Sequence, residues 1–392
     1  MGTRVSITVV ALLALGGLAC AESTTEVESQ PAGGTVAESD SLVSWELGSS
    51  LTGELEQVVS WSEGFAAIMD TDGGETPGGG ELWYSEDGVE WWAAVVRPLG
   101  RTTDIYALAA QGDQLFALSG DIFDRAAPRT LWRRQSGEPW VEVITDVALQ
   151  GIAVNSDRVI AYAWDRFEIV GVFDTATMEP VEFAGLPEVV SAEGVSLGRV
   201  MALDEGFLAT VGRPSGIGAD QPDWTSLHSA DGSDWNEHPS PPPGGVGIPS
   251  DQATAPMFEG RNLVASFSLS WPPPGDAWVT DTGIEFESVP DPVSDRVSGV
   301  APAHLVELTN GTDAGFLAVV KGVIHQSLDG VDWHTIESPP TWSELAEIDR
   351  RGLVHGTMLA TEDSLIAVGV HGGLEGWVGL VNPTTDIWVT ER

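Results

Sequence analysis

The sequence predicts an all-β protein, a seven-bladed β-propeller with four antiparallel strands per blade, because two patterns repeat at the interval of a propeller blade. The first pattern is a polar turn that leads into an aromatic residue. The second is an apolar, strand-like stretch that follows a tight acidic or glycine turn. Each pattern occurs seven times within residues 42–392, and the agreement of the two counts favours seven blades.

The polar turn has three clear copies, which read SEDGVEW (85–91), SADGSDW (229–235) and SLDGVDW (327–333). Asp-Gly between short strand-like runs is a strong hairpin signal, because such turns require positive φ angles. We expect each copy to join the third and fourth strands of a blade. Weaker copies end at Trp140, Phe183, Phe286 and Trp388.

The apolar stretches are expected to form the second strand of each blade. The segment SLVSWELG (41–48) precedes the first unit and reads as a spare strand. We predict that this N-terminal strand completes the last blade and closes the ring, which removes exposed sheet edges. The apolar stretches are 64–70, 113–120, 157–164, 205–212, 260–267, 314–321 and 363–370.

The SxDGxxW turn resembles the Asp-box, or BNR repeat, of sialidase-like β-propellers, although these copies have one residue fewer between Asp and Gly than the usual box. In that family the box is structural: its Ser and Asp hold the turn and its aromatic residue packs between sheets. The resemblance implies this structural role for Ser85, Asp87, Trp91, Ser229, Asp231, Trp235, Ser327, Asp329 and Trp333.

The catalytic signature of sialidases is not found. The Arg-Ile-Pro signature of that family is absent, and Tyr84, Tyr106 and Tyr162 are the only tyrosines that could serve as its nucleophile. Tyr84 directly precedes a polar turn, which favours a structural role. We therefore assign no catalytic residue, and expect a binding protein rather than an enzyme.

The N-terminus predicts export and lipid attachment. An apolar run follows Arg4 within residues 1–19, which read as a lipoprotein signal peptide. Gly-Leu-Ala-Cys at 17–20 resembles the bacterial lipobox, which implies lipidation of Cys20, the only cysteine; simple signal cleavage is the alternative. Residues 20–41 carry that cysteine and then a Ser-, Thr-, Glu- and Gly-rich flexible tether. The propeller is assigned to residues 42–392.

The charge balance excludes several partners and cofactors. With 17 Lys and Arg against 59 Asp and Glu, the formal net charge is −42, which argues against nucleic acid and against direct adhesion to anionic headgroups. The acidity itself favours solubility through self-repulsion. Histidines lack metal-ligand spacing, and Asp70-Thr71-Asp72-Gly73 is only a fragment of a calcium loop, so we expect no metal and no cofactor.

The long connections of the predicted blades emerge on one face, where binding sites usually lie. They carry tryptophans and arginines that suit stacking on sugars and bidentate recognition of carboxylates. The alternative is that these tryptophans cover blade edges and these arginines neutralise an acidic domain. The candidate ligand-binding residues are Arg125, Arg129, Arg213, Trp224, Trp271, Trp342, Arg350 and Arg351.

The sequence thus predicts an extracytoplasmic propeller, anchored to the bacterial cell envelope by an N-terminal lipid, that binds a glycan, peptide or protein partner on its long-loop face. One alternative is a divergent extracellular glycoside hydrolase or lyase with a sialidase-like fold. Another is an assembly factor for a second envelope protein. Propeller architecture hosts unrelated functions, so the fold does not choose between them.

Overall fold

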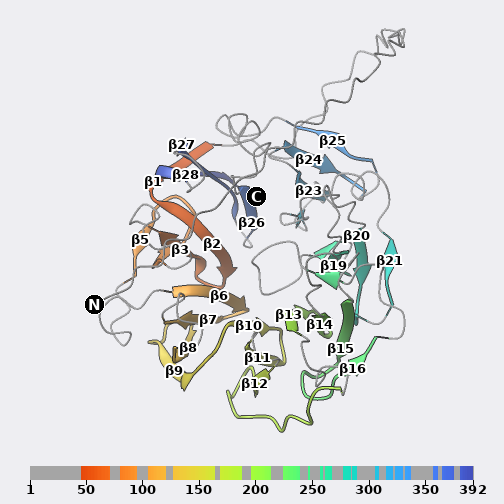
Figure 1. The fold of residues 1–392 in the computed structure, drawn as a ribbon. Helices are drawn as coiled ribbons and strands as arrows, with labels where there is room; N and C mark the ends of the chain where they lie inside the picture. The colour runs from red at the N-terminus through yellow and green to blue at the C-terminus, as the bar shows by residue number, and fades with distance from the viewer. Residues whose placement is uncertain are drawn as a thin grey trace, which may run out of the picture. The chain divides into compact units, whose positions relative to one another are not determined.

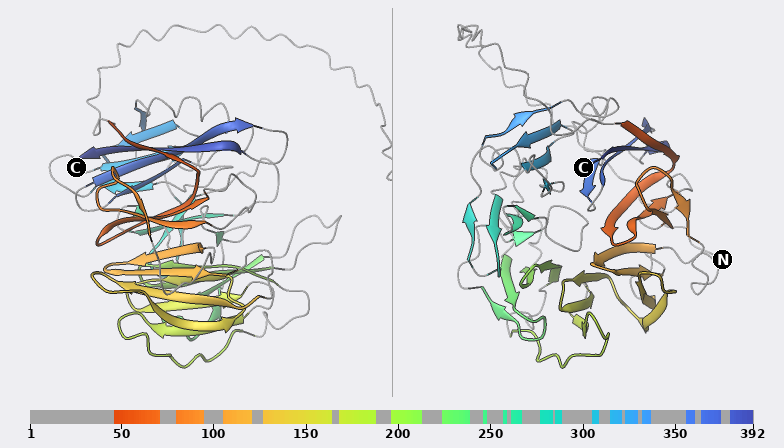
Figure 2. Two further views of the ribbon diagram at one scale, coloured as in Figure 1. Left: turned by 90° about the vertical axis from the view of Figure 1, so that its left-hand side faces the viewer. Right: turned by 180° about the vertical axis from the view of Figure 1, so that it is seen from behind.

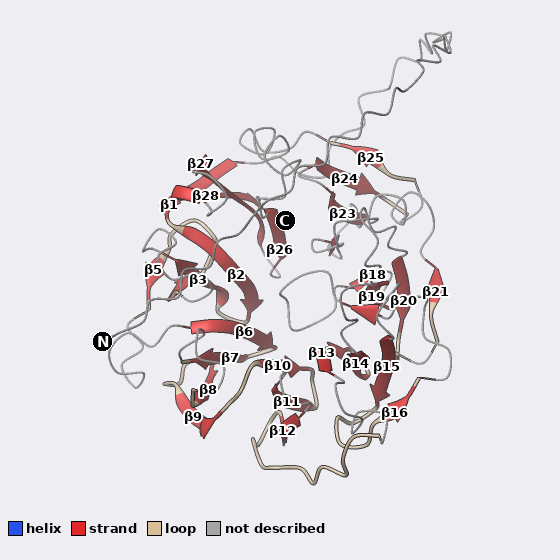
Figure 3. Ribbon diagram, in the orientation of Figure 1, coloured by secondary structure: helices blue, strands red, loops and turns tan. Residues whose placement is uncertain are grey.

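The computed structural model describes parts of the compact unit Ser41–Arg392 and assigns strands and turns to them, with no helix (Figure 3). Among these residues no helix is therefore long and apolar enough to cross a membrane. The described residues are 46–70, 80–94, 105–120, 127–163, 168–187, 196–212, 224–238, 246–247, 257–258, 261–266, 277–283, 285–288, 305–308, 315–320, 323–329, 332–336, 356–360, 364–374 and 380–391.

The first half of the unit forms four antiparallel sheets. Sheet 1 contains β2 (Glu54–Trp61), β3 (Gly64–Asp70), β4 (Glu81–Ser85) and β5 (Trp92–Ala93). Sheet 2 contains β6 (Ile105–Gln111), β7 (Gln114–Ser119), β8 (Arg129–Gln135) and β9 (Val141–Val147). Sheet 3 contains β10 (Gly151–Val154), β11 (Arg158–Ala163) and β12 (Glu168–Asp174). Sheet 4 contains β13 (Ser196–Leu203), β14 (Gly206–Gly212), β15 (Trp224–Ser229) and β16 (Asn236–Glu237).

The second half forms three further antiparallel sheets. Sheet 5 contains β17 (Val246–Gly247), β18 (Met257–Phe258), β19 (Arg261–Ser266), β20 (Ala277–Thr280) and β21 (Glu287–Ser288). Sheet 6 contains β22 (Leu305–Leu308), β23 (Gly315–Val320), β24 (Val323–Ser327) and β25 (His334–Thr335). Sheet 7 contains β26 (Gly356–Ala360), β27 (Ser364–Leu374), β28 (Leu380–Glu391) and β1 (Glu46–Thr52).

The second strand of each sheet coincides with one of the predicted apolar stretches. Strands β3 and β7 are buried at every position. A strand covered on both faces needs a continuous apolar run instead of an alternating pattern, which explains sequences such as GFAAIMD. The outer strands β5 and β16 are only two residues long and are exposed at both positions. Burial therefore falls from the second strand outward within these sheets.

The hydrophobic core is divided among the joints between successive sheets. One cluster joins sheets 1 and 2, and others join 2 to 3, 3 to 4, 4 to 5 and 7 to 1. Contacts lead from β2 to β6, β10 and β13, then through the later sheets to β26, which contacts β2 (Figures 1 and 2). The fold is all-β, with antiparallel sheets packed face to face in chain order as in a β-propeller.

Two buried amides link neighbouring sheets. The side chain of Gln57 on β2 donates to the carbonyl of Leu108 on β6 at 2.9 Å and accepts from its N–H at 2.8 Å. Asn155 reaches from sheet 3 to the β13–β14 turn and donates to the carbonyls of Leu203 at 3.3 Å and Gly206 at 3.2 Å. Buried polar groups are stable only when hydrogen-bonded, so these pairs fix how each sheet sits on the next.

Two sheets depart from the four-strand expectation. Among the described residues, sheet 3 has three strands, and its outer position is held by a single bridge between Phe173 and Pro180. The N–H of Val181 donates to the carbonyl of Val172 at 2.8 Å and the N–H of Asp174 to that of Glu179 at 3.0 Å, so the backbone bonds of this bridge lie on either side of Pro180. Sheet 5 has five strands, because β17 and β18 both pair with β19.

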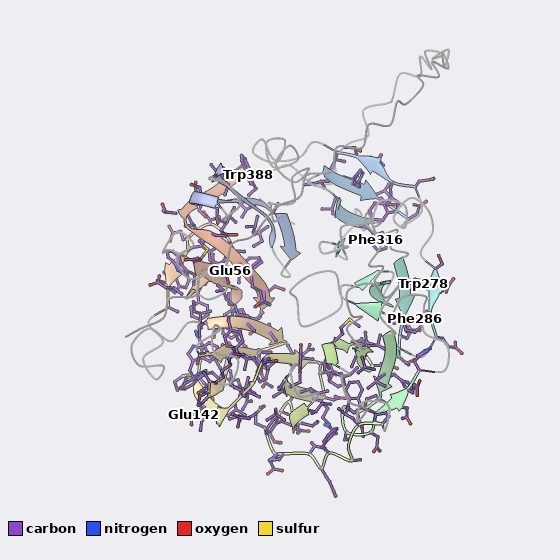
Figure 4. The ribbon with its side chains drawn as sticks, in the orientation of Figure 1. Glu56, Glu142, Trp278, Phe286, Phe316 and Trp388 are labelled. Atoms are coloured by element: carbon purple, nitrogen blue, oxygen red, sulfur yellow. The ribbon has the colours of Figure 1, made fainter. Side chains whose placement is uncertain are left out.

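The aromatic residue at 388 also lies elsewhere than the repeat predicted. Trp388 was expected to open a fourth strand, but it lies within β28, the third strand of sheet 7 (Figure 4). The outer position beside β28 is occupied by β1, where Leu47 stands opposite Trp388. Strand β1 begins at Glu46, so the first residues of the predicted 41–48 strand lie outside the described part of the chain.

The two ends of the unit are hydrogen-bonded to each other through Thr385, whose side chain is fully buried. Its hydroxyl donates to the carbonyl of Gly53 at 2.9 Å and accepts from the N–H of Leu55 at 3.1 Å. Next to it, the hydroxyl of Ser50 donates to Asp386 at 2.6 Å. These bonds join β28 to Ser50 of β1, to Gly53 between the strands and to Leu55 of β2.

We expect Thr385→Val to lower the free energy of unfolding by about 1–3 kcal/mol, because the same shape is kept while a buried N–H and a buried carbonyl lose their partner. Urea unfolding of the full chain measures the change. Thr384→Val is the matched control, since its side chain projects from the opposite face of β28. Equal effects of the two substitutions would contradict the assigned role of the hydroxyl.

Candidate functional site

The two edges of the sheets differ in how strands are connected. On one edge the first and second strands are joined by two-residue turns, for example 62–63, 112–113 and 204–205. The other edge carries the second-to-third and sheet-to-sheet connections, of which 148–150 and 321–322 are short. Its long connections include 71–80, 94–104, 120–128, 213–223, 238–245, 267–276, 289–304 and 336–355. We call these the short-turn edge and the long-loop edge.

Most of the candidate ligand-binding residues lie outside the described part of the chain, namely Arg125, Arg213, Trp271, Trp342, Arg350 and Arg351. Trp224 is the first residue of β15, where its backbone stands opposite Gly212. Arg129 is the first residue of β8. The structure thus places both Trp224 and Arg129 at strand ends on the long-loop edge.

Arg129 is 5% exposed and lies in the joint between sheets 2 and 3. Its guanidinium donates to the carbonyl of Leu149 and lies 4.7 Å from the ring centre of Tyr106. The hydroxyl of Tyr106 donates to the same carbonyl at 3.1 Å. Two donors from sheet 2 therefore bind the carbonyl of Leu149 in the short connection 148–150. The side chain of Arg129 is buried beside this connection and does not project into solvent.

Burial raises the pKa of Tyr106 well above its ordinary value, and the nearby charge of Arg129 only partly opposes this. The phenol therefore stays protonated at neutral pH and acts as a hydrogen-bond donor. Because a nucleophilic tyrosine must lose its proton, this arrangement positions the loop and does not suit nucleophilic catalysis. Sequence reasoning missed this role, since Tyr106 and Leu149 are 43 residues apart in the chain.

Tyr84 lies in a second joint, between sheets 1 and 2. Trp140 donates to its hydroxyl at 3.1 Å, and Arg134 stacks over the rings of Tyr84 and Trp61 at 4.9 and 5.1 Å. Glu63, in the β2–β3 turn, forms an ion pair with Arg134 at 2.7 Å. Burial raises the pKa of Tyr84, although Arg134 lowers it in part.

The acidic side chain of Glu63 ties one short turn to the next. It accepts hydrogen bonds from the hydroxyl of Ser136 at 2.8 Å and from the N–H of Gly137 at 2.6 Å, in addition to its bond with Arg134. Ser136 and Gly137 belong to the β8–β9 turn of sheet 2, and Arg134 lies on β8. The short-turn edge therefore uses its polar groups within and between turns.

The turn at residues 85–91 is held by its own side chains. The hydroxyl of Ser85 accepts from the N–H of Gly88 at 2.7 Å, and Asp87 accepts from the N–H groups of Val89 and Glu90 at 2.8 and 3.1 Å. The indole of Trp91 donates to the carbonyl of Gly88 at 2.9 Å. Such local bonds satisfy the turn backbone where the sheet ladder is interrupted.

The same bonds recur in the other copies. In the turn at 229–235, Ser229 accepts from Gly232 at 2.9 Å and Trp235 donates to the carbonyl of Gly232 at 2.8 Å. In the turn at 327–333, Ser327 donates to Asp329 at 3.1 Å, and the ring centre of Trp333 lies 6.4 Å from that of Phe316. The weaker copy at 280–286 keeps one bond, from the N–H of Gly283 to Thr280 at 2.8 Å.

The turn glycines have two reasons to lack a side chain. Gly88, Gly232 and Gly283 have φ angles of 80°, 75° and 75°, in the left-handed region. A Cβ atom on Gly88 would lie 2.4 Å from Ile366 of sheet 7, and one on Gly232 would lie 2.9 Å from Ile160 of sheet 3. A Cβ on Gly283 would meet Leu208 of sheet 4 at 2.8 Å. Each turn therefore packs against the second strand of the preceding sheet.

Among the described residues, no three or more His, Cys, Asp or Glu side chains lie close enough together to hold a metal ion. Asp70 is described and buried at the end of β3, while the rest of the calcium-loop fragment, 71–73, lies outside the described residues.

No protein-family model and no curated protein sequence matches the chain. Among solved structures, the β-propeller domain of the trilobed protease from Pyrococcus furiosus is 10% identical, with a TM-score of 0.46 over 86% of this chain and 94% of that chain. An acylaminoacyl peptidase from Pyrococcus horikoshii is 11% identical, with a TM-score of 0.47 over 81% and 49%. An α-L-arabinofuranosidase from Fusarium graminearum is 10% identical, with a TM-score of 0.41 over 87% and 98%. These similarities concern the fold alone.

We expect Gly88→Ala to destabilise the chain more than Gly137→Ala. Both glycines have left-handed φ angles, 80° and 74°, so both substitutions introduce similar backbone strain. Only at Gly88 does the new methyl group collide with a neighbouring sheet, whereas nothing lies within 4 Å at Gly137. The difference should be about 1–3 kcal/mol of unfolding free energy, measured with urea, and an equal loss would contradict the packing assigned to the turn.

Acid should weaken the polar turns. Burial raises the pKa of Asp87 and of Asp231, but hydrogen bonds from backbone N–H groups outweigh this effect. Both pKa values therefore lie below the ordinary value of 3.8. Carboxylates with lowered pKa values stabilise the fold fully above 3.8 and lose that contribution as pH falls through the folded-state pKa. The urea midpoint should therefore drop in that window, and by less in the Asp87→Asn, Asp231→Asn double variant. Identical pH profiles of the two proteins would count against this assignment.

Proposed function

We propose that this chain is an extracytoplasmic binding protein, anchored to the bacterial envelope by a lipid on Cys20, that recognises a glycan, peptide or protein on its long-loop edge. The observation that carries the proposal is the difference between the two edges. The first and second strands are joined by two-residue turns at one edge, whereas several connections at the other edge are ten or more residues long. Long loops on a rigid scaffold are the usual location of binding sites.

The proposed scaffold is a seven-bladed propeller in which sheets 1 to 7 are the blades and β1 closes the last one. The pairing of β1 with β28 and the hydrogen bonds of Thr385 to Gly53 and Leu55 support this closure. The turns that contain Ser85, Ser229 and Ser327 are proposed to be Asp-box repeats with a structural role. Residues 1–19 would be removed as a signal peptide, and 20–41 would tether the propeller to the membrane.

The polar side chains described at the short-turn edge are hydrogen-bonded within the scaffold, which favours the opposite edge as the binding surface. Ser85, Asp87 and Glu63 are used within turns or between them, so their bonding capacity serves the scaffold. At the long-loop edge, the carbonyl of Leu149 is held by Arg129 and Tyr106. A supported loop loses less conformational entropy when a partner binds, which favours affinity.

The partner is proposed not to be a nucleic acid, because a formal net charge of −42 repels a polyanion. Aromatic and guanidinium groups of the long-loop edge would contact it. Trp224 begins β15 at this edge, whereas the guanidinium of Arg129 is engaged by the carbonyl of Leu149 and would hold the edge in shape. The other proposed contacts are Arg125, Arg213, Trp271, Trp342, Arg350 and Arg351.

The proposal is tested by incubating residues 42–392 on a glycan array and assaying the supernatant for released sugar. We expect binding without release, and we expect loss of binding in the Trp224→Ala, Trp271→Ala, Trp342→Ala triple variant. Retained binding in that variant would contradict the assigned surface. Sugar release would indicate a glycoside hydrolase or lyase, and capture of one envelope protein with no glycan binding would indicate an assembly factor.

A further inference from the structure

The three clear polar turns each contain a chemically reactive Asp–Gly peptide bond, and in two of them the structure describes both residues of that bond. Gly88 follows Asp87, and Gly232 follows Asp231. In an Asp–Gly sequence the glycine nitrogen can attack the aspartate side chain, because no side chain on the glycine shields its nitrogen or restricts its φ angle. Exposed turns with such a sequence are therefore prone to rearrange to isoaspartate.

The structure engages both partners of that reaction. The N–H of Gly88 donates to the hydroxyl of Ser85 at 2.7 Å, and Oδ1 of Asp87 accepts from Val89 and Glu90 at 2.8 and 3.1 Å. In the second turn, the N–H of Gly232 donates to Ser229 at 2.9 Å. Oδ1 of Asp231 accepts from Ser233 and Asp234 at 2.9 and 3.1 Å.

We propose that Asp87–Gly88 and Asp231–Gly232 are latent isoaspartate sites, which the hydroxyl groups of Ser85 and Ser229 keep unreacted in the folded protein. In the reaction, the glycine nitrogen forms a bond to Cγ of the protonated aspartate, and the amide hydrogen and the carboxyl OH group leave together as water. Water then opens the resulting succinimide by breaking the bond between the nitrogen and the main-chain carbonyl carbon. The net change is an isomerisation with no oxidant and no change in mass.

Holding the glycine N–H on a serine oxygen keeps the nitrogen directed away from Cγ. The carboxylate is also kept ionised, since backbone donors hold the pKa of Asp87 below its ordinary value despite burial. An ionised carboxylate is a poorer acceptor for the attack than the neutral acid. Geometry and charge thus act in the same direction.

The modification would disrupt a joint between sheets. Isoaspartate adds one carbon to the main chain at the aspartate and so displaces the glycine that follows it. There is little room for that shift, because even a Cβ atom on Gly88 would lie 2.4 Å from Ile366 and one on Gly232 would lie 2.9 Å from Ile160. The turn must then move away from the preceding sheet. Ageing at Asp87 would loosen the joint of sheets 7 and 1, and ageing at Asp231 the joint of sheets 3 and 4.

The test is accelerated ageing of the full chain at neutral pH, followed by peptide mapping with isoaspartyl methyltransferase. Ser85→Ala should raise isoaspartate at Asp87 several-fold and leave Asp231 unchanged, and Ser229→Ala should do the reverse. Thr280→Ala is the matched control, because it removes the same turn hydrogen bond to Gly283 but Thr282 precedes that glycine. Formation at the wild-type rate in Ser85→Ala and Ser229→Ala would overturn the proposal.

A second measurement needs no variant. Wild-type protein is aged in parallel under native conditions and in urea, and both sites are mapped. We expect isoaspartate at Asp87 and Asp231 to accumulate several-fold faster in urea, where the serine contacts are lost. Equal rates in the native and the unfolded chain would overturn the proposal even if the serine variants did not fold.

Discussion

Neighbouring sheets meet where a turn glycine reaches the second strand of the sheet before it. At Gly88 and Gly232 this contact leaves no room for a side chain, and the φ angle is one that other residues avoid. The indole that follows each glycine donates back to its carbonyl and packs into the same joint. The repeat therefore encodes a joint between sheets, which explains why polar and apolar residues recur together in one short motif.

Polar links add orientation to this apolar packing. Strands β2 and β6 belong to different sheets, and the side-chain amide of Gln57 links them by donating to and accepting from the backbone of Leu108. Asn155 likewise forms hydrogen bonds between sheets 3 and 4, and Thr385 forms them between the two ends of the unit. Area burial alone would let the sheets slide on one another, whereas buried hydrogen bonds are satisfied in one register only.

The features that could be predicted from the sequence are those that the chain repeats. Second strands followed from continuous apolar runs, the turns followed from the Asp-Gly signal, and the resemblance to the Asp-box implied a structural role for Ser85 and Ser229. The links through Gln57, Glu63 and Tyr106 occur once each and join segments far apart in the chain, so no local pattern announces them.

Arg129 illustrates how a candidate binding residue changes meaning once its neighbours are known. From the sequence it ends a long connection and offers a guanidinium to a ligand. In the structure the same group lies over the ring of Tyr106 and donates a hydrogen bond to the carbonyl of Leu149. Releasing it for a ligand would leave a buried carbonyl with one donor fewer, which is costly in a joint of low polarity. Arg129 is therefore better placed to hold the long-loop edge in shape than to leave that position for a partner.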